Sequence, residues 1–349
     1  MLVLSSYGIR AGSTHLFFGK QIKAVFFFSI LIIALSLSYQ EVMAQPGSGG
    51  SVRPETRDLF RSIRSGSTER LSKELSKGTN VNESLDGYSA LMAASLSGTL
   101  AQMKMLIERG ADVNYEGRDG ITALWLAVPD LEKATLLLNH GADANHTVRG
   151  YNVLVKTAAM PGTTKLLNLL IAKGADPKKS GPDNSLVFNA ASSGDTSILG
   201  MLIRKGADVN DTIYSGDYPI NAAIFYRCHG SVKMLVDNGA RVNVLTRAHE
   251  LVAFNGFTPL MYAAMNNDKG SFYYLLEHGA DPNLRNEKGY TALMLLQQAE
   301  EDDPAMTTAL LNRGAEPGVR TPAGNDALHF AMQKGNTRSV EILKKYANK

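Results

Sequence analysis

The most reactive side chain in this sequence is a single cysteine, Cys228, which is followed by His229. A thiol becomes an effective nucleophile when a base takes its proton and a third group orients that base. No residue near this pair in the sequence supplies the orienting group. Because unpaired cysteines are usually small buried apolar side chains, we predict a packing role for Cys228. A lone cysteine also excludes an internal disulfide and a cysteine-based zinc site.

The other residues able to do acid–base or metal chemistry are scattered. The sequence contains no GxSxG elbow, HExxH pair, phosphate-binding glycine loop or paired cysteines. His140 and His278 each precede a glycine, where a histidine can bond the last carbonyls of a helix. The acidic run "AEEDDP", residues 299–304, predicts a solvated loop rather than a cation site. We therefore predict that the protein is not an enzyme, and we assign no catalytic residue, cofactor or metal.

The dominant pattern is a repeated phrase, "LIERGADVN" at 106–114, with four near-copies downstream. Its glycines are 31 to 35 residues apart, except for one step of 40 residues. A period of about 33 residues marks a solenoid, in which each unit buries its apolar face against its neighbours. An aspartate that recurs with the period is expected to bond turn amides rather than to catalyse, and it stands at Asp112, Asp143, Asp176, Asp208 and Asp281. The glycines are Gly78, Gly110, Gly141, Gly174, Gly206, Gly239, Gly279 and Gly314.

The unit at 119–145 shows which elements build the repeat. Thr122 can cap a short helix with its hydroxyl, and Pro129 must end that helix because its ring clashes with the preceding turn. Apolar residues at helical spacing predict a second helix over 131–140, which Gly141 ends in a left-handed conformation. Isolated helices shorter than about 12–15 residues are marginal in water, so the unit depends on its neighbours.

Two segments carry a family resemblance. "TPLMYAA" at 258–264 and "GYTALMLL" at 289–296 resemble the T-P-L-H-x-A-A signature of ankyrin repeats, and the GAD phrase resembles the end of that repeat. The resemblance implies an all-α ankyrin-repeat solenoid of about nine helix-turn-helix units joined by hairpin-like loops over 55–349. The first unit, 55–86, and the last, 322–349, are expected to be polar end caps. The pairs are expected to begin near Asp58, Ser89, Thr122, Asn152, Ser185, Tyr218, Thr258, Thr291 and Asn325.

Some units depart from the family pattern. The fourth and fifth lack the T-P-L start, so we expect their helices to be less regular. The step of 40 residues adds an insertion around 244–256. Insertions in solenoids often lie on the binding face, but a surface loop also tolerates extra residues at little entropic cost. A further alternative is an enzyme whose site lies in this insertion, near His249 and Glu250.

The first 44 residues have the layout of a secretory signal. Two lysines precede an uncharged apolar segment over 24–38, and a small-x-small pattern ends at Ala44. The apolar segment is shorter than the roughly 20 residues that a membrane span needs. We therefore predict a signal peptide over 1–44, a flexible Gly/Ser/Pro-rich linker over 45–54, and a periplasmic or secreted protein of bacterial origin. The alternative is a membrane-anchored adaptor that keeps this segment.

Charge and composition limit the partner. The sequence has 36 basic and 33 acidic residues, a net charge of +3 over 349 residues. This balance favours neither nucleic acid nor an acidic membrane surface as a partner. A hydrophobic content of 44% is ordinary for a folded soluble protein. We expect a monomer that binds another protein, and a membrane contact only if the signal segment is retained.

The candidates for partner binding are the side chains just after the turn glycine that precedes each first helix, with Tyr218 one place later in its unit. In ankyrin proteins this place borders the concave groove that holds partners, so the resemblance implies a row of side chains along one surface. Aromatic rings anchor interfaces well because they bury large areas with few rotors. The alternative is that they pack on the neighbouring hairpin and stabilise the stack. The candidates are Tyr88, Ile121, Tyr151, Tyr218, Phe257 and Tyr290. We predict a protein–protein interaction module, a non-catalytic scaffold or inhibitor that binds its partner in the concave groove.

Overall fold

The structure is a computed structural model that describes residues 53–177, 185–213, 216–246 and 256–347. The chain divides into two compact units, 1–52 and 53–349, and every described residue belongs to the second. The predicted signal peptide and nearly all of the predicted linker therefore lie outside the described residues. In the described part, no helix combines the length and apolar character that a membrane crossing requires.

The described residues form nine consecutive pairs of helices, so the predicted all-α solenoid is confirmed. The first or inner helix of each pair is, in order, α2 (Pro54–Arg64), α4 (Ala90–Ser97), α6 (Ala123–Ala127), α8 (Val153–Ala158), α10 (Leu186–Ser193), α12 (Pro219–Phe225), α14 (Pro259–Met265), α16 (Ala292–Leu296) and α18 (Ala327–Lys334). The second or outer helix is α3 (Thr68–Ser76), α5 (Leu100–Glu108), α7 (Leu131–Asn139), α9 (Thr164–Ala172), α11 (Thr196–Arg204), α13 (His229–Asp237), α15 (Lys269–Glu277), α17 (Pro304–Asn312) and α19 (Thr337–Ala347).

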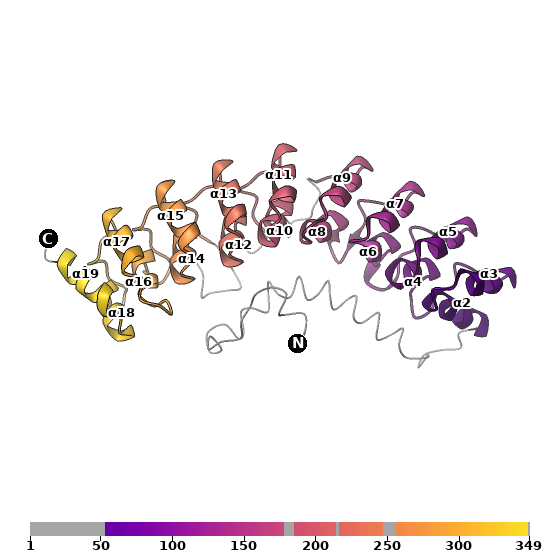
Figure 1. Cartoon of the computed structure of the whole chain (residues 1–349), viewed down its shortest axis with the longest axis horizontal. Coiled ribbons are helices and arrows are strands. Elements are labelled where there is room, and N and C mark those ends of the chain that lie inside the picture. Colours follow the sequence, from indigo (N-terminus) through magenta and orange to yellow (C-terminus); the bar gives the residue numbers. More distant parts are fainter. Residues whose placement is uncertain (1–52, 178–184, 214–215, 247–255, 348–349) are drawn as a thin grey trace. The chain divides into compact units, whose positions relative to one another are not determined.

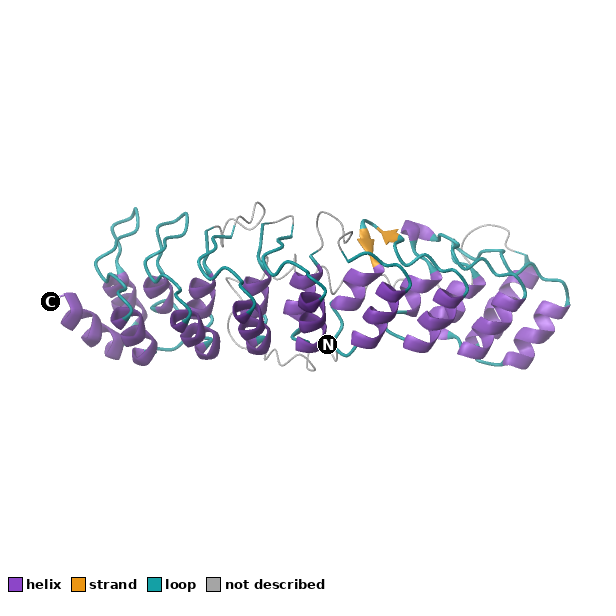
Figure 2. Cartoon of the chain, turned by 90° about the horizontal axis from the view of Figure 1, so that it is seen from above, coloured by secondary structure: helices purple, strands orange, loops and turns teal. Residues whose placement is uncertain are grey.

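Each pair stacks on the pair before it. Inner helices contact inner helices, as α4 does with α2 and α6, and outer helices contact outer helices, as α13 does with α11 and α15. Figure 1 shows the inner helices on the inner side of a curved row and the outer helices on its other side. The loops that join successive pairs project to one side of the helices (Figure 2). The third of these loops, between α7 and α8, contains the antiparallel strands β1 (Thr147–Val148) and β2 (Tyr151–Asn152).

Seven of the nine described inner helices begin where a short polar side chain caps them, and α2 and α12 are the exceptions. The hydroxyl of Thr122, for example, accepts the Trp125 N–H at 3.3 Å, which satisfies one of the amides that the first turn leaves unpaired. Seven of the nine expected starts coincide with the N-cap residue, and the start expected near Asn325 lies one residue from the N-cap Asp326. One expected start was wrong, because α2 begins at Pro54 rather than near Asp58. Proline fits the first helical position because no hydrogen bond is required of it there.

The repeated phrase ends the outer helices α5, α7, α9, α11, α13, α15 and α17 and supplies a core residue to each. In the second unit Leu106 is fully buried, and its carbonyl accepts the Ala111 N–H at 3.0 Å across Gly110. Gly110 has a φ of +84°, which costs little without a Cβ. The equivalent leucines are also fully buried, which explains why the phrase recurs: Leu137, Leu170, Leu202, Leu235, Leu275 and Leu310.

The prediction of less regular inner helices is wrong for both the fourth and the fifth unit. Helix α8 has six residues, one more than α6 or α16, and α10 has eight, as many as α4. Ser185 replaces the usual threonine, and its hydroxyl accepts the Phe188 N–H at 3.1 Å. The T-P-L start is therefore not needed for a regular inner helix, because serine caps a helix as well as threonine does.

Candidate functional site

The six candidate residues lie where the hairpin loops enter the inner helices, but they differ in exposure. Tyr88, Ile121 and Phe257 are 5%, 1% and 4% exposed and belong to the core. Tyr151, Tyr218 and Tyr290 are half-buried. The backbone at this place closes the hairpin: Leu85 and Tyr88, for example, exchange two hydrogen bonds of 2.9 Å.

The buried rings pack within the stack. The Phe257 ring lies 5.3 Å from the Tyr262 ring, and the Tyr290 ring lies 5.5 Å from that of Phe330 in the next repeat. Burial also raises the pKa of the Tyr88 phenol. These two contacts are with inner helices, α14 of the same repeat for Phe257 and α18 of the next repeat for Tyr290, so the rings help to stabilise the stack. The expected row of exposed rings is incomplete because of this packing, and partner binding by the six residues stays a prediction.

Successive hairpins also touch at their tips. Gly256 and Gly289 both have positive φ and leave no room for a side chain: a Cβ would lie 2.8 Å from the Glu287 amide nitrogen and 2.9 Å from Pro322 Cδ, respectively. Arg149 forms an ion pair of 2.9 Å with an aspartate of the preceding tip. These close contacts hold neighbouring loops against one another.

A ladder of asparagines joins the outer ends of the repeats. In each step the side-chain amide nitrogen of an asparagine donates to the carbonyl of the helix-ending phrase glycine in the next repeat, at 2.8 to 3.2 Å. The side-chain oxygen of the same asparagine accepts the backbone N–H of the residue two places after that glycine, at 2.8 to 2.9 Å. The step from the fourth to the fifth repeat would start at Lys178, which lies outside the described residues. The ladder residues are Asn82, Asn114, Asn145, Asn210, Asn243 and Asn283.

The aspartates of the repeated phrase have the structural role predicted for them. Asp112 accepts the Asn114 N–H at 2.9 Å, and Asp143, Asp208 and Asp281 accept the equivalent amide at 2.8 Å. Each aspartate thus fixes the turn that carries the next ladder asparagine. From the sequence, no role was predicted for these asparagines, although they recur in the same phrase. Their hydrogen-bond partners lie a whole repeat away, and local spacing does not reveal such partners.

Long polar side chains reach back to carbonyl groups at the helix ends of the preceding repeat. The buried amide of Gln102 donates to the carbonyls of Ser62 and Ile63, both at 3.2 Å. Lys133 occupies the same place on α7 and donates to the Ser95 carbonyl at 3.1 Å. These bonds satisfy carbonyls that the last turn of a helix leaves unpaired.

Lys156 is the most unusual of these side chains. It is only 6% exposed, and its ammonium donates to the Trp125 carbonyl at 2.6 Å while lying 5.1 Å from the centre of the Trp125 ring. The Trp125 side chain is itself buried, at 5% exposed. Burial lowers the pKa of Lys156 to about 8, because desolvation disfavours the charged form.

A polar cluster joins the sixth and seventh repeats. Asp217 accepts the Tyr218 N–H at 2.9 Å and the Asn221 amide at 3.0 Å. Burial nevertheless raises the pKa of its carboxyl to about 6, because desolvation outweighs these two bonds. Asn221 also donates to the Thr246 hydroxyl at 3.1 Å, which in turn donates to the Phe257 carbonyl at 2.8 Å. This chain of bonds closes the base of the insertion.

The residues with nucleophilic or basic chemistry take structural places. Cys228 precedes α13, its thiol contacts the Ser192 carbonyl at 3.6 Å, and burial raises its pKa, so the reactive thiolate is disfavoured. The rings of His140 and His278 lie 2.9 and 2.8 Å from the carbonyl four residues earlier, as predicted. Within the described residues, no group of three His, Cys, Asp or Glu side chains could hold a metal ion.

The insertion around 244–256 and the acidic run 299–304 are the two loops for which the sequence predicted a role. His249 and Glu250 of the insertion lie outside the described residues. The acidic run 299–304 is not simply solvated. Asp303 is buried, caps α17 through the Met306 N–H at 2.9 Å and pairs with Lys269 at 2.8 Å. The predicted loop thus also anchors the eighth repeat to the seventh.

The family description "Ankyrin repeats (3 copies)" matches residues 59–148 and 154–246, and "Ankyrin repeat" matches residues 255–287. The chain belongs to the ankyrin repeat family. Ankyrin repeats are generally modules for protein–protein interaction, and the family is typically non-catalytic.

Individual relatives of this ankyrin chain are of mixed origin. An ankyrin repeat-containing protein of Treponema pallidum is 37% identical over 89 residues, covering 24% of this chain and 30% of that protein. The ankyrin repeat protein L86 of Acanthamoeba polyphaga mimivirus is 25% identical over 248 residues, or 60% of this chain and 35% of that protein. The nuclear factor NF-kappa-B p105 subunit of Gallus gallus is 38% identical over 96 residues, or 26% and 10%. The chain thus spans about a third or less of the length of these relatives. Because their sources are mixed, the export and the bacterial origin of this chain stay predictions.

Proposed function

We propose that this ankyrin solenoid binds a protein partner on its concave side, as a non-catalytic scaffold or inhibitor. The observation that carries the proposal is the position of Tyr151, Tyr218 and Tyr290, which are half-buried on hairpins of alternate repeats. The asparagine ladder and the tip contacts hold these hairpins in a fixed row. A prearranged surface loses little conformational entropy on binding, and tyrosine rings suit interface anchors.

Photo-crosslinking from single positions tests this surface. A benzophenone side chain at position 151 or 218 should capture the partner from the native envelope fraction. The same group at position 273, on outer helix α15, is the matched control, because Tyr273 is an exposed tyrosine away from the hairpins. The double variant Tyr151→Ala/Tyr218→Ala should weaken binding of the captured partner by at least roughly 30-fold, and Tyr273→Ala should leave it unchanged. Adducts from position 273 alone would contradict the proposal.

We also propose that the protein is exported and works in the periplasm or outside the cell. The support is the signal layout of residues 1–44. N-terminal sequencing of the protein from its native host should give a chain that begins at Gln45, recovered in the soluble envelope fraction. A chain that keeps residues 24–38 and sediments with membranes would instead support the membrane-anchored adaptor.

A further inference from the structure

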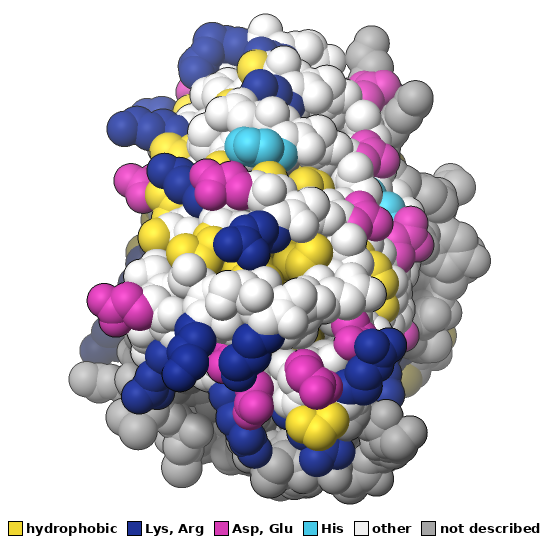
Figure 3. All heavy atoms as spheres, turned by 90° about the vertical axis from the view of Figure 1, so that its right-hand side faces the viewer, with side chains coloured by type: hydrophobic (Ala, Val, Ile, Leu, Met, Phe, Trp, Pro, Cys, Tyr) yellow, Lys and Arg dark blue, Asp and Glu magenta, His cyan; other side chains and the backbone are white. Residues whose placement is uncertain are grey.

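The first repeat carries stripes of cations on both of its helices. Arg53, Arg57, Arg61 and Arg64 are exposed at spacings of four, four and three residues along α2, so they share one side of the helix. On α3 and its end the exposed cations are Arg70, Lys73 and Lys77. Figure 3 looks at this end of the row, where Lys and Arg side chains gather on the lower half with Asp and Glu between them.

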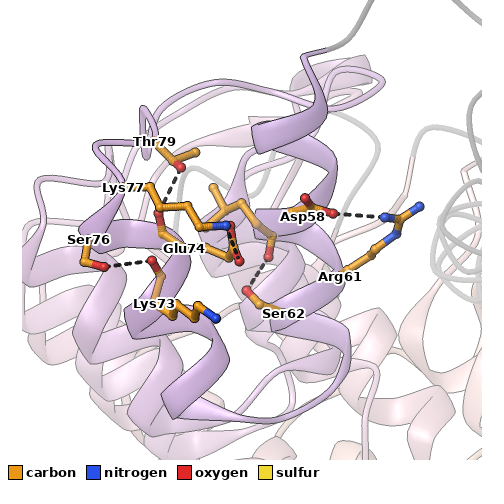
Figure 4. Close-up of polar contacts among 9 residues, drawn as sticks. Asp58, Arg61, Ser62, Lys73, Glu74, Ser76, Lys77 and Thr79 are labelled. Carbon is orange, nitrogen blue, oxygen red and sulfur yellow. Dashed lines mark hydrogen bonds and ion pairs between the residues drawn. The ribbon is translucent and has the colours of Figure 1, made fainter.

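Some of these cations already pair with acidic neighbours, as Arg53 does with Glu83 at 3.3 Å, but the Arg53 side chain stays 71% exposed. Figure 4 shows Arg61 paired with Asp58 at 2.9 Å and Lys77 paired with Glu74 at 2.7 Å, both one helical turn apart. The Arg61 side chain remains 63% exposed. Exposed ion pairs contribute little and are readily exchanged, so the cations can still bind other anions.

The net charge of the whole chain conceals this concentration. Residues 53–77 contain seven basic and four acidic residues, a net charge of +3, whereas residues 78–349 contain 26 basic and 28 acidic residues, a net charge of −2. The weak overall balance, which did not favour an acidic membrane surface, is therefore an average over a basic end and a slightly acidic remainder.

The described surface of α2 and α3 also lacks a large exposed apolar side chain that could anchor a protein partner. In the described part of the chain, the large exposed apolar side chains are Leu131, Leu245, Tyr273 and Met332, and none of them lies on α2 or α3. Protein interfaces depend on a few buried aromatic or aliphatic anchors. Clustered cations without such anchors fit a diffuse anionic surface better than a folded protein partner.

We propose that the first repeat, residues 53–77, binds the anionic phospholipid headgroups of a membrane. Arginine suits this surface because its planar guanidinium can make two parallel hydrogen bonds to a phosphate. Only 14 residues separate Arg53 from the apolar segment over 24–38. A chain held by that segment would carry the stripe close to lipid, and a processed chain would use the stripe to stay near the membrane. The contact leaves the hairpins of later repeats available for a protein partner.

Vesicle co-sedimentation tests the proposal. A chain that begins at Gln45 keeps the complete helical unit, which is compact by itself, and lacks the apolar segment. It should bind vesicles of phosphatidylcholine mixed with phosphatidylglycerol, and not vesicles of phosphatidylcholine alone. Replacing two of the arginines, in the variant Arg57→Gln/Arg61→Gln, should weaken this binding roughly 30-fold. Added salt should weaken the wild-type binding, since the charges are exposed.

A charge-matched variant separates the stripe from net charge. The variant Lys344→Gln/Lys345→Gln removes two exposed cations from the opposite end of the row and should bind as the wild type does. Equal losses in the two variants would overturn the proposal, as would binding to neither kind of vesicle. Binding to polyglutamate but not to vesicles would show that the cations serve an acidic protein segment instead. Circular dichroism melts of each variant confirm that the helices are intact.

Discussion

Replacing Gln102 by alanine should lower the free energy of unfolding by about 3 kcal/mol. The Gln102 side chain is fully buried, donates to two carbonyls at the end of α2, and accepts the Thr99 N–H at 2.9 Å. Alanine would leave three polar backbone groups without this partner, and a cavity in its place. The cost is large because buried groups cannot recover these bonds from water. Urea unfolding of the two proteins measures the difference.

The loss should also be local. Stability in a solenoid is close to a sum of repeat and neighbour terms, so the end repeat should open first when its interface is weakened. Hydrogen exchange in Gln102→Ala should therefore accelerate in α2 and α3 and remain unchanged in α14 to α17. The control is Gln333→Ala, because Gln333 is exposed on α18, and we expect a change within about 0.5 kcal/mol. Uniform acceleration along the chain would contradict a bond that couples only the first two repeats.

A charge test distinguishes the hydrogen bonds from simple packing. Gln102→Glu has nearly the same shape, but an ionised carboxylate can only accept hydrogen bonds. It would face the Ser62 and Ile63 carbonyls with no proton to offer. We expect this variant to be less stable than the wild type at neutral pH and to recover part of the loss in acid, where the carboxyl is protonated. A pH-independent loss would indicate that side-chain volume alone matters at this position.

The sequence predicted the elements that depend on short-range signals. Thr122 and Ser89 cap their helices because a hydroxyl stands at the helix start, and Gly110 ends a helix because it can adopt a positive φ. The start of α2 was misplaced because the proline at position 54, itself a local signal, was not used. Such features repeat every 31 to 35 residues in most of the chain, so the number of units followed from spacing.

The exposure of the candidate surface could not be predicted in the same way. Tyr88 and Tyr290 occupy equivalent places, each just after a hairpin glycine, yet Tyr88 is buried and Tyr290 is half-buried. The difference depends on how each hairpin lies against the next, for example on Arg118 packing over Gly87. Gln102 likewise contacts carbonyls 39 and 40 residues earlier in the chain. A one-dimensional pattern carries no direct signal for contacts of this range.

The buried Lys156 side chain should make the free energy of unfolding depend strongly on pH. Between about pH 7 and about pH 9.5, the wild type should gain about 2 kcal/mol of stability relative to Lys156→Met. The buried ammonium has a pKa lowered to about 8, from an ordinary value of 10.5. Above pH 8 the folded protein has lost this proton while the unfolded chain still binds it, so stability rises with pH until the unfolded lysine also titrates. Below pH 8 both states are protonated, and the folded state bears the full cost of burying the charge.

The position of Lys156 explains why a charge is buried there. The Trp125 carbonyl would normally accept the N–H four residues later, but that residue is Pro129, which has none. The Lys156 ammonium takes this place at 2.6 Å from the next repeat. A cation at a helix C-terminus is also favourable. Methionine would lose this bond but would no longer bury an ammonium, so the difference between two pH values is the informative quantity, not the stability at one pH.

Urea unfolding of wild type and Lys156→Met at both pH values measures this difference. Burial also raises the pKa of Tyr226 and Tyr262, which lowers stability where unfolded tyrosine ionises, but both proteins contain these residues. Their effect therefore cancels in the comparison. Lys344→Met is the control, because Lys344 is exposed, and its pH dependence should follow that of the wild type. Parallel curves for wild type and Lys156→Met would mean that the ammonium is hydrated in solution, and that the missing bond of Pro129 is satisfied by water instead.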